Sequence, residues 1–160
     1  MMNINFIVLG KLKEKYMKEF SAEYEKRLSA YCKVTVTELE PAKLSDNPSQ
    51  SEIDNALSKE TQMILSKIPK GSYVFSMCIE GKQLSSEELS QKLQDIALSG
   101  KSTVTFIIGS SFGLSDEIKK MSDFNFSMSK MTFPHKLARI MLTEQVYRAF
   151  SISNNGKYHK

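Results

Sequence analysis

The sequence predicts an α/β fold in which a mostly parallel sheet carries helices on both faces. Five strand-like runs alternate with five helix-like segments, and this alternation is typical of parallel sheets. The run Thr103–Ile108 is almost entirely β-branched or aromatic, as expected for a strand buried on both faces. The length of 160 residues fits a single domain, 1–160, and is short for two.

The chain opens with a strand and a long amphipathic helix. Ile4–Leu9 is a short apolar run closed by Gly10, which predicts a buried strand. A helix over 12–30 is predicted by one stripe of residues spaced by four: Leu12, Tyr16, Phe20, Tyr24 and Leu28. We interpret this stripe as core packing rather than as a platform for stacking bases.

The next segments predict two strands separated by a loop and a helix. Lys33–Leu39 alternates β-branched with polar residues, as strands do. Residues 40–50 form a proline-containing loop, and a helix follows with apolar positions at Ile53, Leu57, Ile64, Leu65 and Ile68. Tyr73–Ile79 is the third strand, and we expect Gly81-Lys82 to form the turn after it.

Capping signals define the middle helices. Ser85 with Glu88 three residues later is a capping box that opens a helix ending near Gly100. After the fourth strand, Thr103–Ile108, a short helix is expected from Ser115 to Met121.

The last strand and helix are predicted at 124–128 and from about Pro134 to Phe150. Thr132 is the expected side-chain cap, and Pro134 falls in the first turn. This last helix is apolar around most of its circumference, so it needs cover on more than one side. Because a small sheet covers only one side, a second copy of the chain is the expected cover.

The excess positive charge lies at the end of the chain. Residues 130–160 contain six cations and one anion, while residues 1–129 sum to −1, within a net charge of +4. A polyanion such as RNA would suit this region, although a solvated helix face explains the charge equally well. No run is long and apolar enough for a membrane span, and no signal peptide is recognised, so we expect a cytoplasmic protein without a membrane partner.

Cysteine usage fits the same location. Cys32 and Cys78 have no CxxC spacing and no nearby histidine, which argues against a zinc site, and no metal is expected. We interpret both as unreactive packing residues in a reducing compartment.

Ligands of parallel sheets bind beyond the carboxyl ends of the strands, which points to residues 77–82, 109–114 and 128–135. Gly109–Gly113 matches neither the dinucleotide nor the triphosphate fingerprint, and a plain strand-to-helix turn would explain it. Met128–His135 could pack an adenine-sized ring between methionine and phenylalanine side chains. A histidine at a helix start, such as His135, is more often structural than catalytic.

Six blocks carry a family resemblance: GKLKEKY at 10–16, EYEKRL at 23–28, FIIG at 106–109, SKMTFPH at 129–135, EQVYRA at 144–149 and YHK at 158–160. In this order they resemble the ribosomal RNA large subunit methyltransferase H family, the smallest of the SPOUT methyltransferases. The resemblance implies a C-terminal trefoil knot, formed with the dimer surface by about 103–160, and a homodimer. It also implies S-adenosylmethionine as methyl donor and, as substrate, N3 of pseudouridine 1915 in helix 69 of 23S rRNA within the 70S ribosome.

The resemblance also implies the site residues. Eight residues would bind the donor: Met77, Gly109, Met128, Ser129, Lys130, Met131, Thr132 and Phe133. The RNA site, composite between subunits, would receive the terminal residues Tyr158, His159 and Lys160. Arg139, His159 and Lys160 are the candidate cations for charge on the acceptor base, and His135 or His159 is the candidate general base, with water as an alternative.

The sequence departs from the family pattern at two places. Ser110 stands where a second glycine is usual, and its added Cβ lies where the backbone would approach the donor, so we expect it to weaken donor binding modestly or to reshape the loop. Lys160 stands where arginine is also common, and lysine keeps the charge but loses the bidentate fork. Two other functions fit the same sequence: a SPOUT methyltransferase acting on another RNA such as transfer RNA, and a non-catalytic flavodoxin-like nucleotide-binding module.

Overall fold

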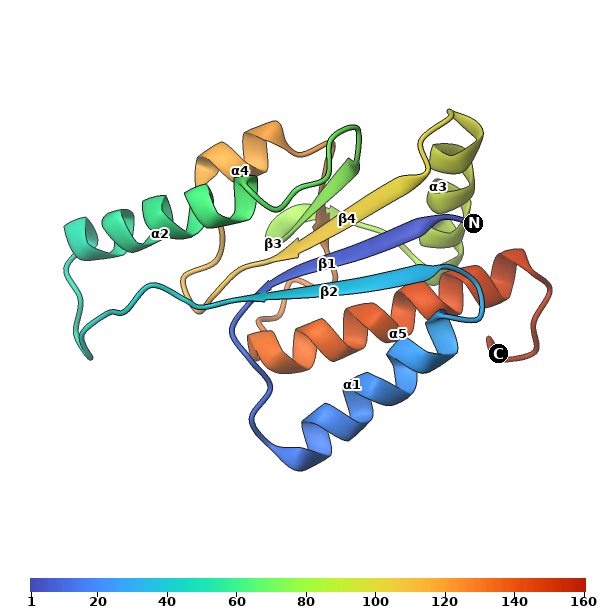
Figure 1. Ribbon diagram of the computed structural model, residues 1–160, viewed down its shortest axis with the longest axis horizontal. Coiled ribbons are helices and arrows are strands. Elements are labelled where there is room, and N and C mark those ends of the chain that lie inside the picture. Colours follow the sequence, from blue (N-terminus) through green and yellow to red (C-terminus); the bar gives the residue numbers. More distant parts are fainter.

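The computed structural model describes residues 1–160, which form one five-stranded sheet with five helices around it (Figure 1). Strands and helices alternate throughout: β1 (Asn3–Leu9), α1 (Lys15–Leu28), β2 (Lys33–Leu39), α2 (Gln50–Leu65), β3 (Tyr73–Gln83), α3 (Ser86–Leu98), β4 (Thr103–Ile108), α4 (Asp116–Met121), β5 (Phe124–Ser127) and α5 (His135–Ser153). The strand order is β2-β1-β4-β3-β5 and every pairing is parallel, which confirms the predicted class.

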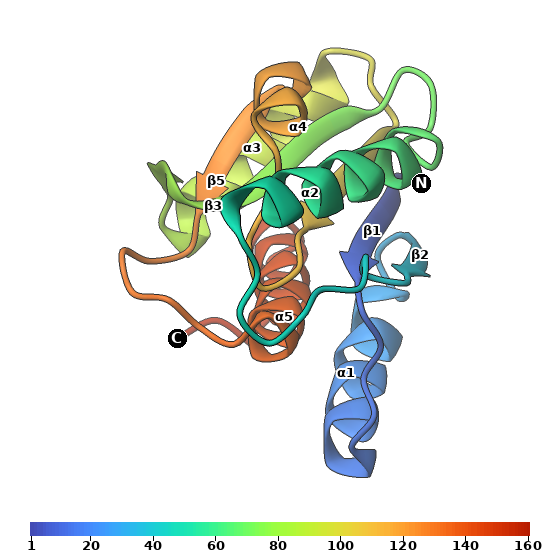
Figure 2. The same ribbon diagram turned by 90° about the vertical axis from the view of Figure 1, so that its left-hand side faces the viewer.

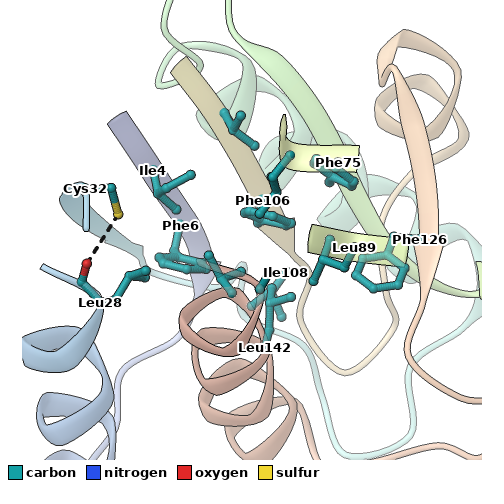
Figure 3. Close-up of a cluster of buried hydrophobic side chains, with 14 of the residues drawn as sticks. Ile4, Phe6, Leu28, Cys32, Phe75, Leu89, Phe106, Ile108, Phe126 and Leu142 are labelled. Atoms are coloured by element: carbon teal, nitrogen blue, oxygen red, sulfur yellow. Dashed lines mark hydrogen bonds between the residues drawn. The ribbon is translucent and has the colours of Figure 1, made fainter. Parts of the chain in front are cut away.

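Helices cover both faces of the sheet, as predicted. On one face, α1, α3 and α5 pack over the larger core, in which the rings of Phe6, Phe75 and Phe106 stack in a row across three strands (Figure 3). On the other face, α2 and α4 cover a smaller core that contains Ile64 and Ile118. The strand β4 contributes to both cores because its alternate side chains point to opposite faces.

Two helices, α2 and α3, begin with a capping box. The predicted one at Ser85 and Glu88 is confirmed, and a second at Ser49 and Glu52 opens α2. The predicted cap at Thr132 is wrong. The residue before α5 is Pro134, without a side-chain cap, because the chain from Met128 onward is spread along a pocket instead of folding back on the helix end.

The interpretation of the stripe Leu12–Leu28 as core is wrong for Tyr16 and Phe20. Leu12 and Leu28 are buried, whereas Tyr16 is 67% exposed and Phe20 is 47% exposed. Figure 2 gives the reason: only the end of α1 lies near the sheet, and its start projects beyond it.

The expected turn at Gly81-Lys82 is also wrong, because β3 continues to Gln83. The ladder with β5 pairs Met77 with Phe126, skips the next four residues and then pairs Lys82 with the same Phe126. A Cβ on Gly81 would lie 2.6 Å from the carbonyl oxygen of Asn125, so glycine is needed where the two strands approach. The skipped residues bulge out of the ladder toward the site described below.

The helix α5 receives part of its cover from within the chain. It lies between α1 and α3 on the sheet (Figure 1), and seven of its 19 residues are buried while the others are partly exposed. The cover of α5 by a second copy of the chain stays a prediction.

Candidate active site

The three strand-end segments singled out by the sequence meet at one pocket of about 810 Å³. The pocket lies beyond the carboxyl ends of β3, β4 and β5, where parallel sheets bind ligands. Seven of the eight predicted donor-binding residues line it: Met77, Gly109, Met128, Ser129, Met131, Thr132 and Phe133. Lys130 is exposed and does not line it.

A tight turn after β4 forms one wall. The Gly113 amide donates to the carbonyl of Ser110 at 2.8 Å, and Gly113 adopts a φ of +78°, which favours glycine. A Cβ on Gly109 would lie 2.6 Å from the carbonyl carbon of Gly113. Glycine at 109 therefore allows the turn to close back on the strand that it leaves.

The loop between β5 and α5 forms a second wall. Ser129 fixes its conformation at two points, because its carbonyl accepts from the Ser127 hydroxyl at 2.9 Å and its own hydroxyl accepts from the Met131 amide at 3.0 Å. Met131 is left 71% exposed. The loop thus offers apolar side chains and free backbone polar groups, which suits a flat heterocycle with polar edges.

The bulge of β3 forms the third wall and supplies three lining residues that were not among the predicted donor-binding residues: Cys78, Ile79 and Glu80. Glu80 pairs with Lys119 of α4 at 2.5 Å, and this hydrogen bond lowers the pKa of the Glu80 carboxyl. Burial raises the pKa of the Cys78 thiol, so this cysteine stays protonated at neutral pH. The segment 77–82 had been named as a strand end, but no sequence signal pointed to Lys119.

His135 and Arg139 lie at the start of α5. His135 lines the pocket, and burial together with the nearby Lys136 charge lowers its pKa, so the ring is neutral at neutral pH. Arg139 borders a small adjacent cavity with His135 and Gly10. The Arg139 guanidinium donates to Glu38 of β2 at 2.7 Å, which ties the helix to the sheet.

The terminal residues do not line the pocket of their own chain. The tail turns back beside α5 (Figure 2), where the Tyr158 hydroxyl donates to Glu144 at 2.9 Å. His159 Nδ1 accepts from Arg148 at 3.1 Å, since a guanidinium only donates, and its Nε2–H donates to Glu87 at 2.7 Å. These two contacts hold the His159 ring against α3 and α5, and Lys160 is exposed.

The pocket fits S-adenosylmethionine in size and chemistry. Its volume lies in the range of small-molecule sites, about 300–1,000 Å³, and the close approach at Gly109 gives a ligand access to the backbone. Methionine and phenylalanine side chains of the β5–α5 loop can enclose an adenine ring. No group of three or more histidine, cysteine, aspartate or glutamate side chains is placed to hold a metal ion.

The comparison with protein families decides what kind of pocket this is. A family model described as "Predicted SPOUT methyltransferase" matches residues 2–159. The chain belongs to the SPOUT methyltransferase family. It is 48% identical over 159 residues to the ribosomal RNA large subunit methyltransferase H of Clostridioides difficile, covering 99% of this chain and 100% of that protein. It is 46% identical, at the same coverage, to the enzyme of that name from Levilactobacillus brevis.

Solved structures support the SPOUT fold. A probable methylase family protein of Haemophilus influenzae superposes with a TM-score of 0.56 at 14% identity, over 99% of this chain and 71% of that one. A tRNA (m1G37) methyltransferase of Aquifex aeolicus superposes with a TM-score of 0.55 at 17% identity, over 91% and 69%. Membership in the SPOUT family excludes the alternative of a flavodoxin-like nucleotide-binding module that the sequence had left open.

None of the helices of this SPOUT methyltransferase has the length and apolar character to span a bilayer.

Proposed function

We propose that this protein transfers a methyl group from S-adenosylmethionine to N3 of pseudouridine 1915 in helix 69 of 23S rRNA, on the assembled 70S ribosome in the cytoplasm. One observation carries the proposal. Relatives named ribosomal RNA large subunit methyltransferase H align with the chain over essentially its whole length at 46–48% identity. The six sequence blocks that resemble this family include the pocket loop 129–135 and the tail 158–160.

The pocket residues would bind and orient the donor. The bound donor supplies an electrophilic methyl group, and the acceptor nitrogen forms the new N–C bond as the C–S bond breaks. Donor and acceptor must meet near attack distance, so positioning by the three pocket walls would supply much of the acceleration. The backbone next to Gly109 and the side chains of the 128–133 segment are the groups in place to do so.

The acceptor is an imide nitrogen, which becomes a good nucleophile when its N–H proton leaves. His135 is neutral at neutral pH and lines the pocket, so it can accept that proton. Negative charge then spreads to the flanking carbonyls, where Arg139, His159 and Lys160 are the proposed stabilising cations. Of these, Arg139 belongs to the same helix start as His135.

The tail is the reason to propose a homodimer. Tyr158 and His159 contact α1, α3 and α5 of their own chain and do not line its pocket. We therefore assign Tyr158, His159 and Lys160 to the pocket of a second copy, where they would contact the RNA. The proposed C-terminal trefoil knot, within about 103–160, would place the pocket loops beside that subunit contact.

Transfer of radiolabelled methyl groups tests the proposal. Intact 70S ribosomes, free large subunits and transfer RNA are offered separately with S-adenosylmethionine, and the labelled nucleotide is identified by mass spectrometry. Methylation of pseudouridine 1915 in 70S ribosomes alone is the expected result. Labelling of transfer RNA instead would replace the proposed substrate while leaving the reaction class intact.

His159 provides a test of the division of labour. The change His159→Ala should lower turnover at least tenfold and leave donor affinity within about twofold, because the tail would serve the substrate side of the site. Donor affinity is measured by calorimetry and turnover with saturating ribosomes. Equal losses of both would contradict the assignment.

A further inference from the structure

We infer that Glu60 and Thr61 of α2 are positioning residues that hold the Ser110–Ser115 segment from behind and thereby set the affinity for the methyl donor. This inference rests on the proposed function. Neither residue lines the large pocket, and neither belongs to the sequence blocks of the family resemblance. Both are adjacent on the buried side of α2, with Glu60 4% exposed and Thr61 2% exposed.

Glu60 holds the start of the turn. Its Oε1 accepts from the Ser110 hydroxyl at 2.8 Å, and its Oε2 accepts from the backbone amide of Ala42 at 3.0 Å. The carboxylate therefore bridges the loop after β2 to the turn after β4. The Ser110 side chain is used for this bridge.

Thr61 holds the end of the same segment through a chain of hydroxyl groups. The Thr61 hydroxyl donates to the Leu57 carbonyl at 2.7 Å, so the Ser115 hydroxyl must be the donor across the 2.6 Å contact with Thr61. Ser115 Oγ in turn accepts from the Ile118 amide and caps α4. The two ends of the segment are thus bound to consecutive residues of one helix.

This hold is needed because the turn has open space behind it. A second cavity of about 190 Å³ lies between the turn and α2, lined by Ser110–Phe112 on one side and by Pro41, Leu44, Ile53 and Leu57 on the other. Phe112 borders both cavities and is 47% exposed. Packing alone does not fix the turn, so its position relative to the donor depends on the two hydrogen-bonded ends.

A turn fixed before the donor arrives loses less conformational freedom on binding, which raises affinity. The added Cβ of Ser110, which departs from the family pattern, was expected to weaken donor binding. We infer the opposite effect, namely that the Ser110 side chain strengthens donor binding. Its hydroxyl ties the donor-binding turn to Glu60, and removing that hydroxyl should weaken donor binding.

A double-mutant cycle on donor binding tests the inference. We expect Glu60→Leu, which is similar in size and has no polar side-chain atom, and Ser110→Ala each to raise the calorimetric Kd for S-adenosylmethionine about tenfold, since each removes the hydrogen bond between the two side chains. The double variant should bind no more weakly than the Glu60→Leu variant, because both changes remove the same contact. Thr61→Val, which keeps the shape, should raise the Kd severalfold.

A matched control separates positioning from general loss of stability. Ser49→Ala removes the capping box of α2, eleven residues before Glu60 on the same helix, and touches neither the turn nor the pocket. It should lower the unfolding midpoint and leave the donor Kd unchanged. In turnover assays, Ser110→Ala should raise the KM for the donor and leave kcat and the KM for ribosomes unchanged.

Two results would overturn the inference. Wild-type donor affinity in both the Glu60→Leu and Ser110→Ala variants would show that the contact does not set the turn, and so would an equal loss in Ser49→Ala. Absence of donor binding by the wild-type protein is a different failure, because it would refute the proposed function on which the inference rests.

Discussion

Gly109 determines the pocket shape at the scale of a single residue. Its hydrogen atom faces the Gly113 carbonyl, where any side chain would collide with backbone. Neighbouring Ser111 is exposed at the tip of the same turn. The two positions therefore respond to substitution very differently.

We predict that Gly109→Ala weakens donor binding more than tenfold and lowers the free energy of unfolding by about 1–3 kcal/mol, because backbone has to shift to admit the methyl group. Calorimetry and urea unfolding measure the two effects. Ser111→Ala is the control in the same turn and should change both quantities much less, because Ser111 lines the pocket but its replacement adds no atom that meets backbone. Normal binding by Gly109→Ala would contradict the predicted role of the turn.

His135 should make stability depend on pH. Its pKa is lowered from the ordinary value of 6.5 by burial and by the Lys136 charge, so between the two pKa values the unfolded chain binds more protons than the folded one. Stability therefore rises with pH through this window and is lost as the pH falls below 6.5. We predict that His135→Gln flattens this part of the profile, measured by urea unfolding between about pH 5 and pH 8.

The Lys136→Gln variant controls for the second cause of the shift. Removing the neighbouring charge should bring the His135 pKa closer to its ordinary value and reduce the slope without abolishing it. An unchanged slope in His135→Gln would assign the pH dependence to other groups.

At the residue scale, motifs predicted most of the pocket and missed the groups behind it. The seven candidates that line the pocket were implied by the family resemblance, and they fall in the three strand-end segments that the predicted parallel sheet had indicated. Glu60 left a weaker signal: it lies seven residues after Ile53 and four before Ile64, inside the apolar stripe of α2. A carboxylate in such a stripe needs a buried partner, but which partner depends on tertiary packing.

At the element scale, α5 is held to the sheet by an ion pair as well as by packing. Arg139 and Glu38 join α5 to the edge strand β2, and the arginine side chain is only 9% exposed. This contact fixes the helix whose first turn carries His135. Its loss should therefore affect stability more than the loss of a surface pair.

We predict that Glu38→Gln lowers the free energy of unfolding by about 1–3 kcal/mol, because it leaves a buried guanidinium without its charged acceptor. The control Glu23→Gln breaks the exposed pair with Arg27 and should cost less than about 1 kcal/mol. Urea unfolding measures both. Similar values for the two variants would show that the Arg139 pair behaves as a surface contact.

The elements themselves were largely predictable, and two of the errors share one cause. Hydrophobic period and capping residues located the strands and helices to within a few residues, except for the cap expected at Thr132. The errors at α1 and at Gly81 both concern what an element packs against. Period shows which face of an element is apolar, but the partner of that face follows from the three-dimensional arrangement.

At the scale of the whole molecule, the proposed dimer implies that a complete active site needs two chains. In the proposed arrangement each active site combines the pocket of one subunit with the tail of the other. A subunit with a defective pocket and a subunit with a defective tail can then form one complete site between them.

We predict that mixing the Gly109→Ala and His159→Ala proteins in equal amounts, with subunit exchange, restores about a quarter of wild-type activity. Half of the exchanged dimers would be mixed, and one of the two sites in each would be intact. Methyl transfer to 70S ribosomes is the measurement, with each variant alone as control. A mixture no more active than its components would place the tail in the site of its own chain.

Because all five strands are parallel, their carboxyl ends and the pocket lie at one end of the molecule, and their amino ends lie at the other. The amino end of the sheet is therefore available for labelling. Leu98, at the end of α3 where the chain returns to the amino end of β4, is 85% exposed. A Leu98→Cys variant would offer a reactive thiol there, since burial raises the pKa of Cys32 to about 12 and also raises that of Cys78. A fluorophore attached by this thiol would report the approach of the enzyme to a ribosome from the side remote from the chemistry.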